Sequence, residues 1–192
     1  MNVALRWEGP FEFLGKNGRS LLLAPAGAHA GIYVWGARTE RGLLPHYVGE
    51  TKDSFGKRHL QHFQAYVSGV YSTRDADAFV AGREQMLHRG PLWRSNTLPA
   101  FQQFIDNFPF FASHLYRTLQ SIEIYVAPLE VVQRTRRLVE GGLVRVFREA
   151  PHDIRALFPD LRVWSRLPND EVLAVECVNP PPILGFPSRF EA

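Results

Sequence analysis

An arginine and two histidines interrupt an aromatic stripe in residues 51–66 of this sequence, which read TKDSFGKRHLQHFQAY. Asp53 and Ser54 are both suited to cap a helix that runs to about Tyr66. At 3.6 residues per turn one broad face of this helix carries Phe55, Arg58, His59, His62 and Tyr66. Guanidinium groups carry a permanent charge and imidazoles exchange protons near neutral pH, so two histidines and an arginine on an otherwise aromatic stripe are unusual for a simple core. Taken singly, a histidine on an aromatic face is more often a satisfied core residue than a base or a metal ligand.

Two predicted strands precede this helix, and each carries a tyrosine close to a glycine. Residues 31–36 and 44–50 are rich in β-branched and aromatic side chains, and a polar connection containing Gly42 separates them. This pattern predicts an antiparallel hairpin with a fairly long loop. Because alternate side chains of a strand share a face, we expect Tyr33 and Tyr47 to point to a common face.

A strand and a long helix are predicted later in the chain, at 121–129 and 131–150. Apolar residues recur at helical spacing in the second segment, and Pro151 ends it. Its expected buried stripe is made of Val132, Val139, Leu143 and Val146, with Glu140 at the border. Four arginines lie away from the stripe and suit either phosphate contacts or a solvated surface, namely Arg134, Arg137, Arg145 and Arg148.

The other segments have less regular patterns. Residues 67–120 are expected to form a mainly helical insertion, with helices over DADAFVAGREQMLH and LPAFQQFIDNF. Within it, one stretch suits either a nucleic-acid contact or a packed loop, through Trp93, Arg94 and Asn96. A further strand is predicted at 171–178, and the Pro-rich tail, residues 179–192, is expected to run extended over the surface.

The composition is that of one globular domain. The 192 residues are 45% hydrophobic, and a formal charge of +3 with a pI of about 9.2 permits a nucleic-acid partner without requiring one. A single cysteine, Cys177, excludes an internal disulfide and a zinc site built on paired cysteines. The first residues lack a signal-peptide pattern, and the longest uncharged run, 21–37, is too short and too interrupted to span a membrane. We therefore expect a cytoplasmic protein without a membrane partner.

The order of these elements and motifs resembles the GIY-YIG nuclease superfamily. The naming triplets are Gly31-Ile32-Tyr33 and Tyr47-Val48-Gly49, with valine in place of the usual second isoleucine. Arg58 falls in the first helix after the hairpin, where the family carries its arginine. His62 follows four residues later, as in restriction-type members. Glu140 matches the family glutamate, which an aliphatic pair follows three residues later.

The resemblance implies one α+β domain over residues 1–192, with a small antiparallel three-stranded sheet flanked by helices. Its core would comprise about 30–65 and 121–150, with the helical insertion at about 67–120 and a C-terminal strand extension. The implied activity is that of a metal-dependent endonuclease, which hydrolyses phosphodiester bonds of DNA with Mg2+ or Mn2+.

The resemblance also implies a catalytic role for each motif residue. Glu140 would hold the divalent cation through a hard oxygen ligand, and Arg58 would grip the scissile phosphate through its planar fork of donors. Tyr33 would take a proton from the attacking water. Because a free tyrosine has a pKa near 10, it would need a neighbouring acceptor such as His62. Tyr47 would orient the water or the phosphate on the same face.

Two other functions are compatible with the sequence. The family often places an asparagine after its glutamate helix, whereas the corresponding stretch here reads PHDIRALF and contains none. A nucleic-acid-binding module without turnover is therefore one alternative. The other is a protein-interaction domain that uses the aromatic insertion and the tail, residues 179–192. Nothing in the hairpin or the arginines distinguishes RNA from DNA.

Overall fold

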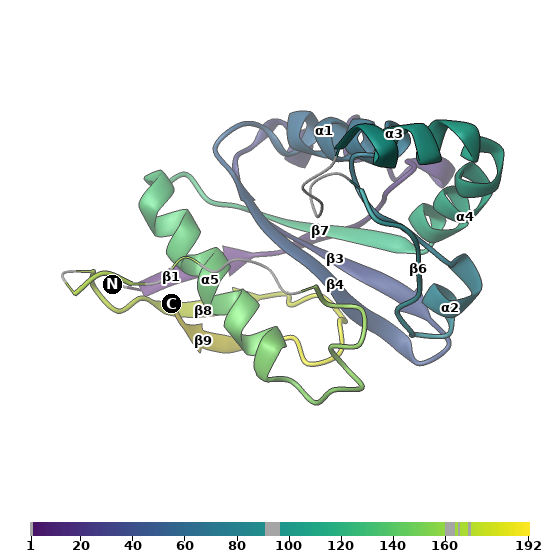
Figure 1. Cartoon of the computed structure of the whole chain (residues 1–192). Coiled ribbons are helices and arrows are strands. Elements are labelled where there is room, and N and C mark those ends of the chain that lie inside the picture. The colour runs from purple at the N-terminus through teal and green to yellow at the C-terminus, as the bar shows by residue number, and fades with distance from the viewer. Residues whose placement is uncertain (1, 91–96, 160–163, 165, 169) are drawn as a thin grey trace.

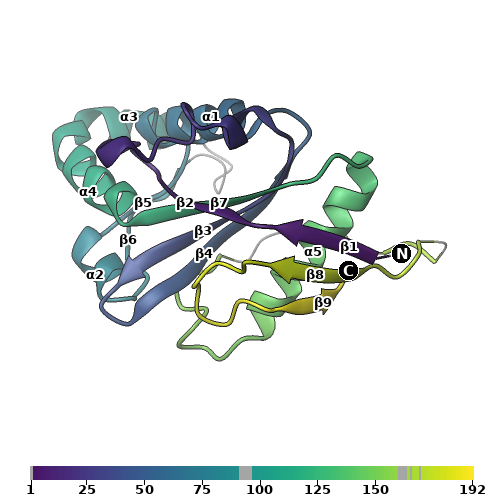
Figure 2. The same ribbon diagram turned by 180° about the vertical axis from the view of Figure 1, so that it is seen from behind.

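The computed structural model describes residues 2–90, 97–159, 164, 166–168 and 170–192 as a mixed α+β protein (Figures 1 and 2). Trp93, Arg94 and Asn96 lie outside the described residues. The helices are α1 (Phe55–Val67), α2 (Ala76–Val80), α3 (Thr97–Asp106), α4 (Phe108–Gln120) and α5 (Gln133–Glu149), with short 3-10 helices at Lys16–Gly18 and Pro25–Ala28. The strands are β1 (Asn2–Arg6), β2 (Glu8–Glu12), β3 (Gly31–Thr39), β4 (Gly42–Thr51), β5 (Thr73–Arg74), β6 (Met86–His88), β7 (Ile122–Pro128), β8 (Ala174–Val178) and β9 (Arg189–Glu191).

A four-stranded antiparallel sheet in the order β2-β7-β3-β4 carries the hairpin. The predicted strand at 121–129 is confirmed as β7. The three strands expected in this sheet are present as β3, β4 and β7, and β2 adds a fourth at the edge. Its sequence contains Gly9-Pro10, which weakens any strand pattern, but proline is tolerated in edge strands, and the register shifts between Glu8 and Phe11.

The hairpin itself is longer and tighter than its sequence suggests. The strands predicted at 31–36 and 44–50 extend outwards into β3 and β4, so that only Glu40 and Arg41 connect them. The expectation of a long loop is wrong because the ladder of hydrogen bonds continues beyond a bulge in the middle of the hairpin.

The sheet separates two hydrophobic cores. Tyr33 and Trp35 point into a core that includes residues of α1, α2 and α4. Ile32, Val34 and Val48 point the opposite way, into a core with α5. Helix α5 therefore lies on the other face of the sheet from α1, as Figure 1 also shows. The predicted alternation of side chains along β3 is confirmed.

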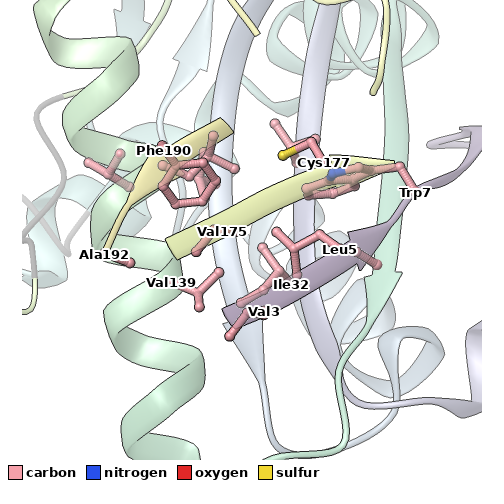
Figure 3. Close-up of a cluster of buried hydrophobic side chains, with 14 of the residues drawn as sticks. Val3, Leu5, Trp7, Ile32, Val139, Val175, Cys177, Phe190 and Ala192 are labelled. Atoms are coloured by element: carbon pink, nitrogen blue, oxygen red, sulfur yellow. The ribbon is translucent and has the colours of Figure 1, made fainter. Parts of the chain in front are cut away.

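A second sheet, in the order β1-β8-β9, packs into the α5 core (Figure 3). β1 pairs in parallel with β8, and β8 pairs antiparallel with β9. The strand predicted at 171–178 is found in its later part, as β8. The expectation that residues 179–192 run over the surface is wrong at their end, because β9 returns to this sheet and buries Phe190 and Ala192.

The insertion between α1 and β7 is helical only in part. The predicted helix LPAFQQFIDNF corresponds to α3, and α4 follows it. The helix predicted over DADAFVAGREQMLH ends at Val80, and Met86–His88 instead forms β6, which pairs with β5. Gly82 explains the early end, since its φ of 71° is the left-handed conformation that glycine adopts after helices.

Helix α5 confirms the predicted helix to within two residues at its start. Val139 and Leu143 of the expected stripe are buried, whereas Val146 is only half-buried. Val132 is 71% exposed, because it precedes the first turn as the N-cap. The side chains and glycines buried along the helix are Arg136, Leu138, Val139, Gly141, Gly142, Leu143, Val144 and Phe147.

Among the helices of the described residues, none combines the length and apolar character needed to cross a bilayer.

The end of the tail is expected to contribute strongly to stability. Phe190 is 9% exposed and packs in the α5 core, so Phe190→Ala should lower the free energy of unfolding by about 3 kcal/mol. Leu184 lies in the same tail but is 41% exposed, and Leu184→Ala should cost less than about 1 kcal/mol. Urea unfolding followed by circular dichroism measures both. Equal, small effects would contradict the packing of the tail into the core.

Candidate active site

Tyr33 of β3 lies against two side chains of α1. Ser54 caps this helix by accepting a hydrogen bond from the backbone N–H of Lys57. The four-residue spacing of Arg58 and His62 places both on the helix face that meets the sheet. Arg58 Nε–H donates to the Tyr33 hydroxyl at 3.3 Å, and His62 Nε2 is 2.8 Å from the same oxygen. Three of the predicted site residues therefore converge on one phenolic oxygen.

Gly49 makes room for this arrangement. It is the register partner of Tyr33 across the hairpin. A Cβ at Gly49 would overlap the end of the Tyr33 ring and its hydroxyl. The glycine that closes the second triplet is thus required by the tyrosine of the first.

Tyr47 completes an aromatic wall beside Tyr33. The two rings are stacked, with centroids 6.0 Å apart and planes at 27°. Burial, together with the neighbouring Tyr71, raises the pKa of Tyr47 to about 12. Tyr47 therefore stays protonated at neutral pH, so its hydroxyl group can donate and accept hydrogen bonds.

His62 is enclosed in the site and neutral. Burial first, and then the charge of Arg58, lower the pKa of its imidazole to about 2. Its second ring nitrogen, Nδ1, lies 2.9 Å from the hydroxyl of Tyr71. Burial also raises the pKa of Tyr33 well above 10. The resting site therefore holds a neutral tyrosine against a neutral histidine, with the Arg58 guanidinium as the adjacent positive charge.

Glu140, on α5, interacts electrostatically with the two tyrosines of the site. Burial, and then repulsion by the Glu50 carboxylate, raise its pKa to about 7, while a hydrogen bond from the Glu50 backbone opposes this shift. The charge of Glu140 in turn affects the pKa of both Tyr33 and Tyr47. Glu140 is thus the predicted residue whose charge is poised to change near neutral pH.

Glu50 is a site residue that the sequence motifs did not indicate. Its side chain is 11% exposed and lies 3.3 Å from Arg136 and 3.5 Å from Arg137, and it accepts a hydrogen bond from Gln133 at 3.1 Å. These contacts tie β4 to the first turns of α5. Its position in the sequence could have indicated it, because Glu50 directly follows the triplet Tyr47-Val48-Gly49.

The four arginines proposed for nucleic-acid contact are all half-buried. Arg134 forms an ion pair with Asp170. Arg137 forms one with Glu50, and its guanidinium lies 4.2 Å from the centre of the Trp164 ring. Two of the four arginines therefore bind side chains of the protein itself. Arg145 and Arg148 lie further along the same helix.

The donor set around Glu140 fits a cation that keeps most of its water ligands. Within the described residues, no group of three or more His, Cys, Asp or Glu side chains is placed to hold a metal ion. Mg2+ needs only one or two carboxylates, because it retains several waters. Glu140 is the available carboxylate, whereas the ion pairs with Arg136 and Arg137 already balance the charge of Glu50.

Comparison of the chain with protein-family models, with curated proteins and with solved structures finds no match. Its function is therefore inferred from its own residues and their geometry.

Glu140 should make stability depend on pH. Its pKa rises from 4.5 in the unfolded chain to about 7 in the folded protein, so the folded state binds the proton more tightly. Stability from this group is full below pH 4.5 and is lost as the pH rises through 7. Glu140→Gln removes the ionisation and should raise the free energy of unfolding at pH 8 by about 2 kcal/mol, with little change at pH 4.5.

Thermal unfolding of both proteins at the two pH values checks this. Glu149→Gln, on the exposed end of the same helix, is the matched control and should have little effect at either pH. A Glu140→Gln effect that is the same at both pH values would contradict a raised pKa.

Proposed function

We propose that the protein is a metal-dependent endonuclease that hydrolyses phosphodiester bonds of DNA at a GIY-YIG-type site. The observation that carries the proposal is the convergence of Arg58 and His62 on the hydroxyl of Tyr33. Tyr47 stacks beside this group, and Glu140 influences its charge from the opposite helix. A packed core does not require an arginine and a histidine on one tyrosine oxygen, whereas hydrolysis of a phosphodiester can use the arginine to bind phosphate and the histidine to accept a proton.

Arg58 is the group that binds the scissile phosphate. Its Nε–H is occupied by Tyr33 and its Nη1 by the side chain of Gln61, at 3.1 Å. The helix and these two contacts fix the plane of the guanidinium. A guanidinium held in this way presents its remaining N–H groups to phosphate oxygens at little further cost in side-chain entropy. Arg58 also stabilises negative charge that develops on those oxygens.

Tyr33 and His62 move the proton of the attacking water. The neutral imidazole accepts the Tyr33 proton at Nε2 while the Tyr33 oxygen takes one from water. In the resting site the low pKa of His62 opposes this transfer. A phosphate bound to Arg58 adds a negative charge that offsets the guanidinium, which is one cause of that low pKa. Substrate binding therefore makes His62 a stronger base.

Glu140 is the residue that would hold Mg2+ or Mn2+. A divalent cation bound there supplies charge neutralisation to the phosphate and the departing oxygen. The ionised form of Glu140 is the one that binds a cation, and its pKa of about 7 places that ionisation in the working range. The ion pairs of Glu50 with α5 hold Glu140 in position.

The proposal predicts cleavage that depends on both Arg58 and Glu140. With Mg2+ or Mn2+, the purified protein should nick or cut members of a panel of duplex, branched and single-stranded DNA. Glu140→Ala should abolish cleavage, and Arg58→Ala should lower its rate by about 100-fold or more, because each removes charge stabilisation of the transition state. Gel electrophoresis of end-labelled substrates over time measures the rates.

Each residue has a matched control on its own helix. Lys57→Ala next to Arg58 and Glu149→Ala on α5 remove a charge without touching the site, and both should cleave at nearly the wild-type rate. A salt-sensitive gel shift without nicking would instead support a binding module. RNA versions of the same substrates identify the preferred sugar. Cleavage that survives Glu140→Ala would contradict the proposal.

A further inference from the structure

The hydrolytic role proposed for His62 uses one ring nitrogen and leaves the other unexplained. His62 is 1% exposed, so both nitrogens depend on partners within the protein. Nε2 is 2.8 Å from the hydroxyl of Tyr33, and Nδ1 is 2.9 Å from the hydroxyl of Tyr71. A neutral imidazole has one N–H donor and one acceptor nitrogen. Two hydroxyl partners therefore determine which nitrogen carries the hydrogen.

Tyr71 is held firmly enough to control this choice. It follows α1 in the chain, and its backbone N–H donates to the carbonyl of Ala65 at 3.0 Å. Its ring meets that of Tyr66 edge to face, with centroids 5.0 Å apart and planes at 89°. Both contacts are to α1, which also carries His62. Tyr71 and His62 thus keep their relative positions through one helix, independently of the sheet that carries Tyr33.

We propose that Tyr71 is a positioning residue that holds His62 in the tautomer with hydrogen on Nδ1. The Tyr71 oxygen accepts the hydrogen bond from Nδ1–H, and the lone pair of Nε2 then faces the hydroxyl of Tyr33. Tyr71 is only half-buried, so its own hydroxyl hydrogen can turn toward solvent while its oxygen accepts. The catalytic meaning of this arrangement rests on the proposed function, whereas the choice of tautomer does not.

The arrangement accounts for each proton in the transfer. The O–H bond of Tyr33 breaks and an N–H bond forms at His62 Nε2, while Tyr33 regains a proton from the attacking water. The resulting imidazolium keeps its Nδ1–H on the Tyr71 oxygen, which stabilises the positive charge. The departing oxygen takes its proton from solvent water, and the extra proton on His62 passes to solvent after the products leave. With hydrogen on Nε2 instead, no lone pair would face Tyr33 and the transfer could not begin.

The test is Tyr71→Phe, which removes one oxygen and keeps the ring against Tyr66. Nitrogen-15 NMR of the histidine rings in the free protein reports the His62 tautomer, and cleavage assays report kcat and KM separately. We expect hydrogen on Nδ1 in the wild type and loss of that preference in Tyr71→Phe. We expect kcat to fall by about 10- to 100-fold, with KM nearly unchanged.

Tyr66→Phe is the matched control, because it removes a hydroxyl from the same aromatic cluster without a bond to His62. It should leave the His62 nitrogen signals and kcat unchanged, and thermal unfolding confirms that both variants are folded. Hydrogen on Nε2 in the wild type, or unaltered His62 signals in Tyr71→Phe, would overturn the proposal, as would an altered tautomer with unchanged kcat. If the wild type cleaves no substrate, the proposed function fails, and the nitrogen signals alone then decide whether Tyr71 sets the tautomer.

Discussion

The register of the β3-β4 hairpin is the constraint on which both cores and the candidate site depend. A shift of one residue would turn every side chain of a strand to the opposite face of the sheet. In the observed register Tyr33 lies across from Gly49, the residue whose missing side chain leaves space for the phenol. The same register directs Ile32 and Val34 into the core with α5. One pattern of strand pairing thus determines both the packing of the cores and the geometry of the candidate site.

Two helices approach this hairpin from opposite faces, and they are positioned by different forces. Helix α1 places Arg58 and His62 by its own periodicity, so their hydrogen bonds to Tyr33 follow once the helix packs on the sheet. Helix α5 is also tied to β4 by the carboxylate of Glu50, which contacts Arg136 and Arg137. Removing the charges of Glu50 and the two arginines from water is unfavourable, and the ion pairs with their hydrogen bonds can offset this cost. This arrangement also brings two carboxylates together, which is one cause of the raised pKa of Glu140.

Local periodicity made the hairpin, α1, β7 and α5 predictable, because each has a strong pattern within a short window. The convergence of Tyr33 with Arg58 and His62 could be expected only from the family resemblance, since no local rule fixes how α1 packs on the sheet. The sequence did not predict β2, because Gly9-Pro10 interrupts the strand pattern at this edge. It did not predict β9 either, because the pairing of β9 with β8 is a tertiary contact. Glu50 and Tyr71 were missed for the same reason, as their partners are set by packing and not by spacing.

The parallel pairing of β1 with β8 affects the order in which parts of the protein can fold. Asn2 pairs with Ala174, so β1 leaves the ribosome long before its partner β8 has been synthesised. Such distant contacts make folding slow, because a long loop must close before the pairing stabilises it. Helix α5 rests on this late sheet, and with it Glu140. The hairpin and α1 can form early, whereas the core around α5 is complete only after β8 and β9 have been synthesised.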